Sequence, residues 1–166
     1  MAVSRQAPSP SNHLVVGKKV PNFSVDCFPA GQFQLSSQSG KRIVLYFYPK
    51  DDTPGCTLEG HDFNRLRQQF ADLNTVIFGI SRDSVKSHEK FINKCGYHFP
   101  LLSDPDETVC QMFSVIKEKN MYGKKVFGIE RSTFVIGPDQ ILMAEFRKVK
   151  ADGHAEEILK YLQGLI

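Results

Sequence analysis

Two uninterrupted apolar runs and one periodic segment dominate the hydrophobic pattern of the chain. Ile43–Tyr48 (IVLYFY) and Thr75–Ser81 (TVIFGIS) are rich in β-branched and aromatic residues, which is typical of strands buried on both faces of a sheet. Between them, apolar side chains recur at steps of three and four residues: Phe63, Leu66, Phe70 and Leu73. That period indicates an amphipathic helix from about Pro54 to Leu73.

The rest of the chain predicts further strands and helices. The expected strands are Asn22–Phe28, Gln32–Ser36, the short piece Pro100–Leu102, and a hairpin of Ser132–Ile136 and Ile141–Phe146 around GPDQ. The expected helices are Ser84–Lys94 with Gly96 as C-cap, Glu107–Ser114, and the segment from His154 onward. This order predicts an α/β fold with a central mixed β-sheet flanked by helices on both faces and with an N-terminal β-hairpin. We expect a single domain over residues 14–166, preceded by a disordered tail at residues 1–13.

Composition and charge exclude several classes of function. The chain has 166 residues, of which 41% are hydrophobic and 23% charged, and its formal net charge is only +3. The Lys and Arg residues are scattered, so no nucleic-acid or membrane-surface partner is indicated. No apolar run approaches the roughly 18 residues that a membrane span needs, and the first residues lack the apolar core of a secretory signal. We therefore expect a cytoplasmic protein.

The cysteines and histidines form no metal-binding pattern. Cys27, Cys56, Cys95 and Cys110 contain no CxxC pair and fit no zinc template. In the reducing cytoplasm each is either a small buried apolar residue or a reactive thiol. His61, His88 and His154 are isolated in the sequence, so we expect surface or capping roles for them. No phosphate-binding glycine motif is present, and we expect neither a metal nor a cofactor.

Cys56 stands where a strand passes into a helix. Thr53 is a suitable N-cap and Pro54 suits the first helical position, which puts Cys56 in the first turn. Unpaired backbone N–H groups and the helix dipole favour a thiolate there. The polar residues before Thr53 and the small Gly55 argue against a thiol buried in the core. Cys56 is either a small residue filling a helix start or, as we favour, a reactive thiol at the carboxyl edge of the sheet.

The residues around Cys56 resemble a known family. YPKDDTPGCTLE (residues 48–59) is similar to the peroxiredoxin motif, in the form of the Q-type or bacterioferritin-comigratory subgroup. Further segments resemble the same subgroup in the same order, namely GISRDSVKSHEKF, FPLLSDPDE, KNMYGKKVFGIERSTFVIGPDQ and RKVKADGHAEEIL. The resemblance covers nearly everything beyond the first residues. It implies a thioredoxin-like fold and the reduction of hydrogen peroxide and organic hydroperoxides.

The resemblance also implies roles for four residues. Cys56 would be the peroxidatic cysteine, which attacks the peroxide and becomes a sulfenic acid. Thr53 would contact the thiolate and peroxide, Pro49 would shield the pocket, and Arg131 would approach the thiolate from far along the chain. Each has a simpler alternative: Thr53 as a cap only, Pro49 as a strand terminator, and Arg131 as a surface ion-pair residue. Glu59 either helps to hold the helix start or is an ordinary solvated glutamate.

The sequence leaves open which thiol resolves the sulfenic acid. Two positions where the subgroup carries a resolving cysteine are His61 and Ile92 here. Cys95, one turn beyond Ile92, is the possible resolving residue, although local unwinding would be needed to join it to Cys56. We expect structural roles for Cys27 and Cys110.

Two catalytic cycles follow. Either Cys56 and Cys95 form a disulfide that thioredoxin reduces, or, as we favour, Cys56 acts alone with glutathione or a glutaredoxin-type protein. The subgroup resemblance indicates a monomer. The alternative functions are a thioredoxin-like disulfide oxidoreductase, which would need a cysteine where Glu59 stands, and a holdase-type binding protein.

Overall fold

The structure is a computed structural model, and it describes residues 14–165. The tail expected at residues 1–13 lies outside the described residues. The helices are α1 (Pro54–Ala71), α2 (Val85–Cys95), α3 (Thr108–Met112), α4 (His154–Gln163) and the 3₁₀ helix η2 (Leu35–Gln38). The strands are β1 (Ser24–Phe28), β2 (Gly31–Gln34), β3 (Arg42–Phe47), β4 (Thr75–Ser81), β5 (Leu101–Ser103), β6 (Ile116–Met121), β7 (Lys124–Ile129), β8 (Ser132–Ile136) and β9 (Leu142–Phe146). Every element expected from the sequence is present, with ends that shift by a few residues.

Seven strands form one mixed sheet in the order β2-β1-β5-β4-β3-β8-β9. β3, β4 and β5 run parallel, whereas β8 pairs antiparallel with β3 and β1 pairs antiparallel with β5. β1 and β2 form the expected N-terminal hairpin. The carboxyl ends of the three parallel strands and the beginning of β8 therefore meet at one edge of the sheet.

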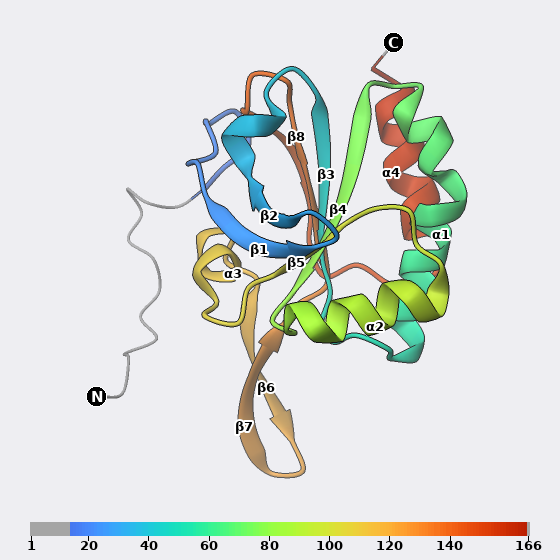
Figure 1. Cartoon of the computed structure of the whole chain (residues 1–166). Coiled ribbons are helices and arrows are strands. Elements are labelled where there is room, and N and C mark those ends of the chain that lie inside the picture. Colours follow the sequence, from blue (N-terminus) through green and yellow to red (C-terminus); the bar gives the residue numbers. More distant parts are fainter. Residues whose placement is uncertain (1–13, 166) are drawn as a thin grey trace.

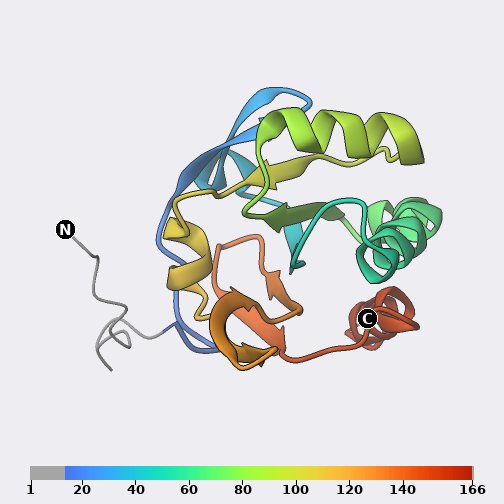
Figure 2. The ribbon, with the colours of Figure 1, turned by 90° about the horizontal axis from the view of Figure 1, so that it is seen from below.

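Helices cover both faces of the sheet, as predicted. α1, α2 and α4 lie on one face, where α1 and α4 run side by side, and α3 lies on the other (Figures 1 and 2). Alternate residues of β3 point into two separate apolar cores: Val44 and Tyr46 pack with α1 and α4, and Ile43 and Leu45 pack with α3. Because both of its faces are covered, β3 reads as a continuous apolar run. Among the described residues, no helix is long and apolar enough to span a bilayer.

The helix ends follow the local sequence signals. α1 begins at Pro54 directly after Thr53, and Phe63, Leu66 and Phe70 form its buried stripe. α2 begins after Ser84, whose side-chain oxygen accepts a hydrogen bond from the Ser87 N–H. α2 ends at Cys95 and is followed by its C-cap Gly96, which has φ of +71°. Glycine adopts this left-handed conformation without the steric cost of a Cβ atom.

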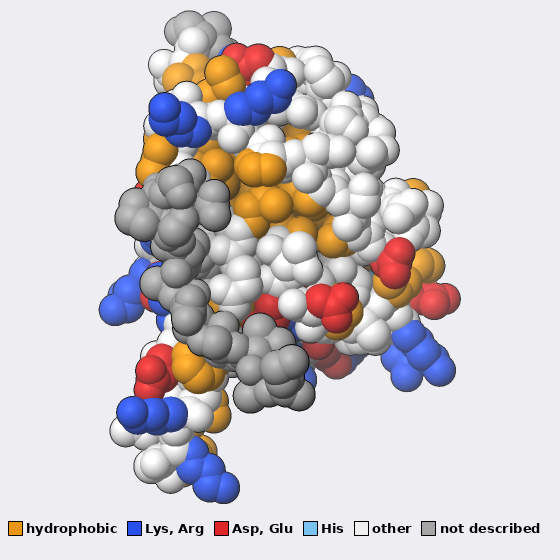
Figure 3. All heavy atoms as spheres, turned by 90° about the vertical axis from the view of Figure 1, so that its left-hand side faces the viewer, with side chains coloured by type: hydrophobic (Ala, Val, Ile, Leu, Met, Phe, Trp, Pro, Cys, Tyr) orange, Lys and Arg blue, Asp and Glu red, His pale blue; other side chains and the backbone are white. Residues whose placement is uncertain are grey.

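The β6–β7 hairpin is an element that the sequence pattern did not predict. Its strands pair only with each other, and they project from the body of the molecule (Figure 1). Most of its side chains are exposed, with basic groups along it (Figure 3), so no apolar alternation marks the strands. The sequence signal for this hairpin is Gly123. In the structure, Tyr122 and Gly123 both have positive φ, as the two central residues of a type I′ hairpin turn require.

Candidate active site

Cys56 lies in the first turn of α1, beside the carboxyl end of β3. The expectation that its thiol avoids the core is wrong, because the residue is 2% exposed and packs in the apolar cluster that contains Tyr46, Tyr48 and Phe63. These large aromatic side chains come from β3, from the residue after it and from α1, and they enclose the small side chain. The residues next to Cys56 in the sequence are polar, but the side chains that surround it in the fold are aromatic.

Arg131 approaches Cys56 from the start of β8, the strand next to β3. β3 and β8 are antiparallel, and Phe47 at the end of β3 pairs with Ser132 at the start of β8. Arg131 therefore stands at the edge where α1 begins, and its Nη2 donates to Cys56 Sγ at 3.5 Å. A Cβ atom on Gly55 would lie 3.1 Å from the same Nη2, so glycine leaves the guanidinium room to approach. The alternative of a surface ion-pair residue is wrong for Arg131.

Glu59 is the buried partner of this arginine. Arg131 Nη1 donates to Glu59 Oε1 at 2.6 Å, and the Glu59 side chain is fully buried. Burial raises the pKa of Glu59 to about 7, against the lowering effect of Arg131. Burial tends to lower the pKa of Arg131, but Glu59 and Cys56 together raise it above its ordinary value. The alternative of a solvated glutamate is wrong, and Glu59 instead orients the guanidinium that faces the thiol.

Thr53 and Pro49 flank the site in the loop between β3 and α1. Thr53 has the extended backbone of an N-cap, but its hydroxyl donates to the Lys50 carbonyl at 2.8 Å and does not cap the first turn. A hydroxyl that donates in this way still has lone pairs with which to accept a hydrogen bond. Pro49 is partly buried just after β3. The roles that the resemblance implies for these two residues stay predictions.

Cys95 is the last residue of α2 and is partly buried. Its neighbour is Tyr97, whose hydroxyl donates to the Thr57 carbonyl at 3.0 Å. Burial raises the pKa of Tyr97 most, and a hydrogen bond with Cys95 and the nearby Cys56 raise it further. Tyr97 thus connects the end of α2 to the first turns of α1.

Cys27 and Cys110 lie in the other apolar core, away from Cys56. The Cys27 thiol donates to the Pro29 carbonyl at 3.2 Å. Cys110 is fully buried, and burial, followed by the nearby Asp104, raises its pKa well above the ordinary range of a thiol. The structural roles expected for both residues are confirmed.

Two of the three histidines singled out in the sequence are buried, contrary to expectation. His88 is fully buried between Asp51 and the Leu102 carbonyl. His154 is 2% exposed and contacts the Thr133 hydroxyl, and burial lowers its pKa. Of these three, His61 is the exposed one. An isolated histidine gives no sequence signal of burial, because its partners come from other elements.

Within residues 14–165, no group of three or more His, Cys, Asp or Glu side chains is arranged to hold a metal ion.

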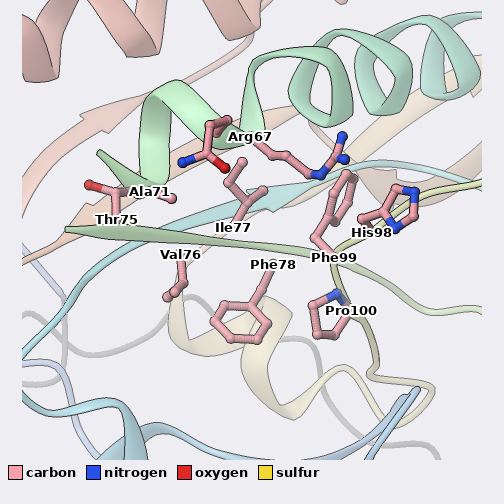
Figure 4. A pocket seen from close by; sticks show the side chains of 10 residues that line it. Arg67, Ala71, Thr75, Val76, Ile77, Phe78, His98, Phe99 and Pro100 are labelled. Carbon is pink, nitrogen blue, oxygen red and sulfur yellow. The ribbon is translucent and has the colours of Figure 1, made fainter. Parts of the chain in front are cut away.

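A pocket of about 450 Å³ lies elsewhere, between the second half of α1, β4 and the segment before β5. Figure 4 shows Ile77 and Phe99 at its wall, with the Arg67 and His98 side chains close by. None of its lining residues belongs to the Cys56 site. Cys56 thus lies outside this pocket.

Comparison with known proteins agrees with this geometry. The sequence model of the AhpC/TSA family matches residues 16–145. Peroxiredoxin Bcp of Xanthomonas campestris is 54% identical over 132 residues, which are 80% of this chain and 82% of that protein.

Two solved structures extend the similarity to the fold. The bacterioferritin comigratory protein of Xanthomonas campestris, described for its alkyl peroxide reduction activity, matches with a TM-score of 0.82 at 50% identity, covering 86% of this chain and 90% of that one. A yeast mitochondrial 1-Cys peroxiredoxin, described as resolved via glutathione/thioredoxin systems, matches with a TM-score of 0.78 at 25% identity, covering 92% of this chain and 76% of that one. The expected thioredoxin-like fold is confirmed.

Proposed function

The chain belongs to the AhpC/TSA family and is a thiol-dependent peroxidase of the peroxiredoxin type, and we propose that Cys56 is its peroxidatic residue. The observation that carries this assignment is the contact of Arg131 Nη2 with Cys56 Sγ at 3.5 Å, in the first turn of α1. A thiolate in this position faces a guanidinium on one side and unpaired helix N–H groups on the other.

The proposed first step is nucleophilic attack by the Cys56 thiolate on the terminal oxygen of a hydroperoxide. The S–O bond forms as the O–O bond breaks, and the sulfur is oxidised to a sulfenic acid. The leaving hydroxide or alkoxide takes up a proton and becomes water or an alcohol. Negative charge develops on the leaving oxygen, and the Arg131 guanidinium, held by Glu59, is oriented to stabilise it. We assign Thr53 to hydrogen bonding with the reacting atoms and Pro49 to shielding them.

The proposed second step returns the sulfenic acid to a thiol. One thiol condenses with it to give a disulfide and water, and a second thiol reduces that disulfide. Cys56 is enclosed in the first turn of an α-helix, and Cys95 ends another helix. A disulfide needs the two Cα atoms within about 7 Å in a suitable orientation, so an internal bond places a geometric demand on both helices, whereas an external thiol needs only access to the sulfur of Cys56. This favours a single-cysteine cycle with glutathione or a glutaredoxin-type protein over a Cys56–Cys95 disulfide that thioredoxin reduces.

Peroxide consumption with dithiothreitol tests the assignment of Cys56. We expect Cys56→Ser to reduce the rate to that of the uncatalysed mixture, because serine cannot form the sulfenic acid. Cys95→Ser is the matched control and should keep most of the activity under the single-cysteine cycle. Full activity in the Cys56→Ser variant would refute the assignment.

Peptide mass spectrometry without reductant, after one equivalent of peroxide, tests the second step. We expect oxidised Cys56 with no link to another residue. A peptide in which Cys56 is joined to Cys95 would overturn the single-cysteine cycle and leave the first step intact.

We further propose that the enzyme works as a monomer in the cytoplasm. The four cysteines are unpaired in the structure, as is usual in a reducing compartment, and the subgroup resemblance supports the monomer. Sedimentation analysis of the reduced protein measures the oligomeric state. The alternative of a disulfide oxidoreductase gains no support, since Glu59 occupies the place of the second cysteine and pairs with Arg131. No observation on the described residues favours a holdase.

A further inference from the structure

A buried polar cluster joins the loop before Cys56 to the start of α2. Asp51 is 7% exposed and lies five residues before Cys56. Its Oδ1 accepts a hydrogen bond from the Tyr48 hydroxyl at 2.6 Å, and its Oδ2 accepts one from the Ser87 hydroxyl at 2.8 Å. The Nδ1 atom of His88 lies 2.8 Å from the same Oδ2. We call Tyr48, Asp51, Ser87 and His88 the Asp51 cluster.

His88 extends the cluster to the sheet. Its side chain is fully buried, and its Nε2 lies 2.8 Å from the Leu102 carbonyl oxygen. Because a carbonyl oxygen only accepts, Nε2 carries a hydrogen and donates it. His88 therefore has a fixed orientation, with Nδ1 directed at the Asp51 carboxylate. A buried carboxylate is costly to remove from water, so these contacts constrain the loop strongly.

Two further contacts hold the loop: the backbone N–H of Asp51 binds Asp83, just before α2, and the side chain of Asp52 binds Lys94, in α2. The Asp51 N–H donates to Asp83 Oδ2 at 2.9 Å, and that oxygen also accepts from the Ser81 hydroxyl at 2.6 Å. Lys94, near the other end of α2, donates to both carboxylate oxygens of Asp52. The loop that leads into α1 is thus attached to α2 by two consecutive aspartates.

The two halves of the proposed cycle place opposite demands on this loop. Reaction with peroxide requires Cys56 in its enclosed position, where Arg131 Nη2 lies 3.5 Å from Sγ. Cys56 is 2% exposed. Reaction of the sulfenic acid with another thiol therefore requires its sulfur to become accessible from the solvent. The first turn of α1 and the loop before it must therefore move between the two steps, and contacts that hold the loop oppose that movement.

We propose that Asp51, Ser87 and His88 are positioning residues, which hold the loop against α2 and thereby set the balance between peroxide reaction and resolution. This inference rests on the proposed function. The residues do not touch the reacting atoms. They act through Cys56, by favouring the enclosed position over the open one.

Single-turnover kinetics separate the two steps. The chain has no tryptophan, so we would follow oxidation of Cys56 by rapid quench, alkylation and mass spectrometry. The second rate is that of the preformed sulfenic acid with added glutathione. In Asp51→Asn we expect slower oxidation and faster resolution, with the ratio of the two rates changed by about tenfold or more, as loss of a buried charged hydrogen bond would produce. Ser87→Ala, which removes one hydroxyl donor, should shift both rates in the same directions by a smaller factor, and His88→Asn, which keeps one N–H donor, should lie between the two.

A matched control separates positioning from general loss of stability. Asp104 is also a buried carboxylate, and it accepts hydrogen bonds from the backbone N–H groups of Val109 and Cys110 in α3. Asp104→Asn should destabilise the fold without changing the ratio of the two rates.

Unchanged rates in all three cluster variants, or rates that fall together as in Asp104→Asn, would overturn the inference. Ser87→Ala keeps the test decisive if Asp51→Asn does not fold. If the wild-type protein itself consumes no peroxide with dithiothreitol, the proposed function fails and the inference with it. If the wild type is active and the variants keep its two rates, the inference fails and the proposed function stands.

Discussion

At the scale of single residues, the site depends on how one arginine is held. Arg131 donates to the Glu59 carboxylate with one nitrogen and to Cys56 with the other. A guanidinium presents its donors in a rigid plane, so fixing Nη1 on Glu59 also fixes the direction of Nη2. The carboxylate is fully buried, and among the described residues no donor lies within hydrogen-bond distance of its Oε2. The ionised form of Glu59 is therefore incompletely compensated, which agrees with its raised pKa.

Glu59 makes the stability of the protein depend on pH. Its folded-state pKa is about 7 instead of 4.5, so between these values the folded state binds a proton that the unfolded state releases. The stabilisation is present below the unfolded pKa and is lost as pH rises through 7. We expect Glu59→Gln to remove this loss, by up to about 3 kcal/mol between about pH 5 and about pH 8.

Urea unfolding of both proteins across this range measures the difference. The other titrating groups, His154 among them, are shared and cancel in the comparison. Parallel stability curves for wild type and variant would contradict the assigned pKa.

At the scale of elements, the two helices nearest the site begin in different ways. α2 carries its own cap, since Ser84 Oγ accepts from the Ser87 N–H at 3.1 Å. The Thr53 hydroxyl before α1 instead donates back to Lys50. The start of α1 contacts Arg131 and Tyr97 from other elements, and the loop before it is held by the Asp51 cluster. This leaves the first turn, which carries the thiol, dependent on tertiary structure.

The cap of α2 gives a prediction for stability. Ser84→Ala should lower the free energy of unfolding by about 1 kcal/mol, because the N–H of Ser87 loses its acceptor. Ser37→Ala, at an exposed position in η2, is the control and should change it by less than about 0.5 kcal/mol. Denaturant unfolding measures both, and equal effects would show that the cap contributes nothing.

At the scale of the whole molecule, the seven-stranded sheet and its helices carry the site, while the β6–β7 hairpin stands apart. The hairpin pairs only with itself, but β7 ends two residues before Arg131. The chain thus leaves the body after β5 and α3 and returns at the edge of the sheet where the site lies.

Shortening the hairpin tests how far the body is independent of it. Lys117 pairs with Gly128, so residues 118–127 can be replaced by an Asn-Gly turn of the type that two-residue hairpins prefer. Since the removed side chains are mostly exposed, we expect the melting temperature to change by only a few degrees, the range that about 1 kcal/mol produces in a protein of this size. Circular dichroism melting curves provide the measurement, and loss of a cooperative transition would contradict independence.

The sequence by itself determined the elements that bury a continuous or periodic apolar surface, such as β3, β4 and α1, because their pattern records which faces meet the core. It also determined the place of Cys56, since Thr53 and Pro54 mark a helix start locally. The tertiary structure alone decided the burial of the thiol, the pairing of Glu59 with Arg131, and the burial of His88 beside Asp51. These properties depend on partners that are distant in the chain, and only the antiparallel pairing of β3 with β8 and the packing of α2 against the loop bring those partners together. The β6–β7 hairpin has no apolar alternation in its sequence, because most of its side chains are exposed and only its base, at Ile116 and Ile129, meets the core.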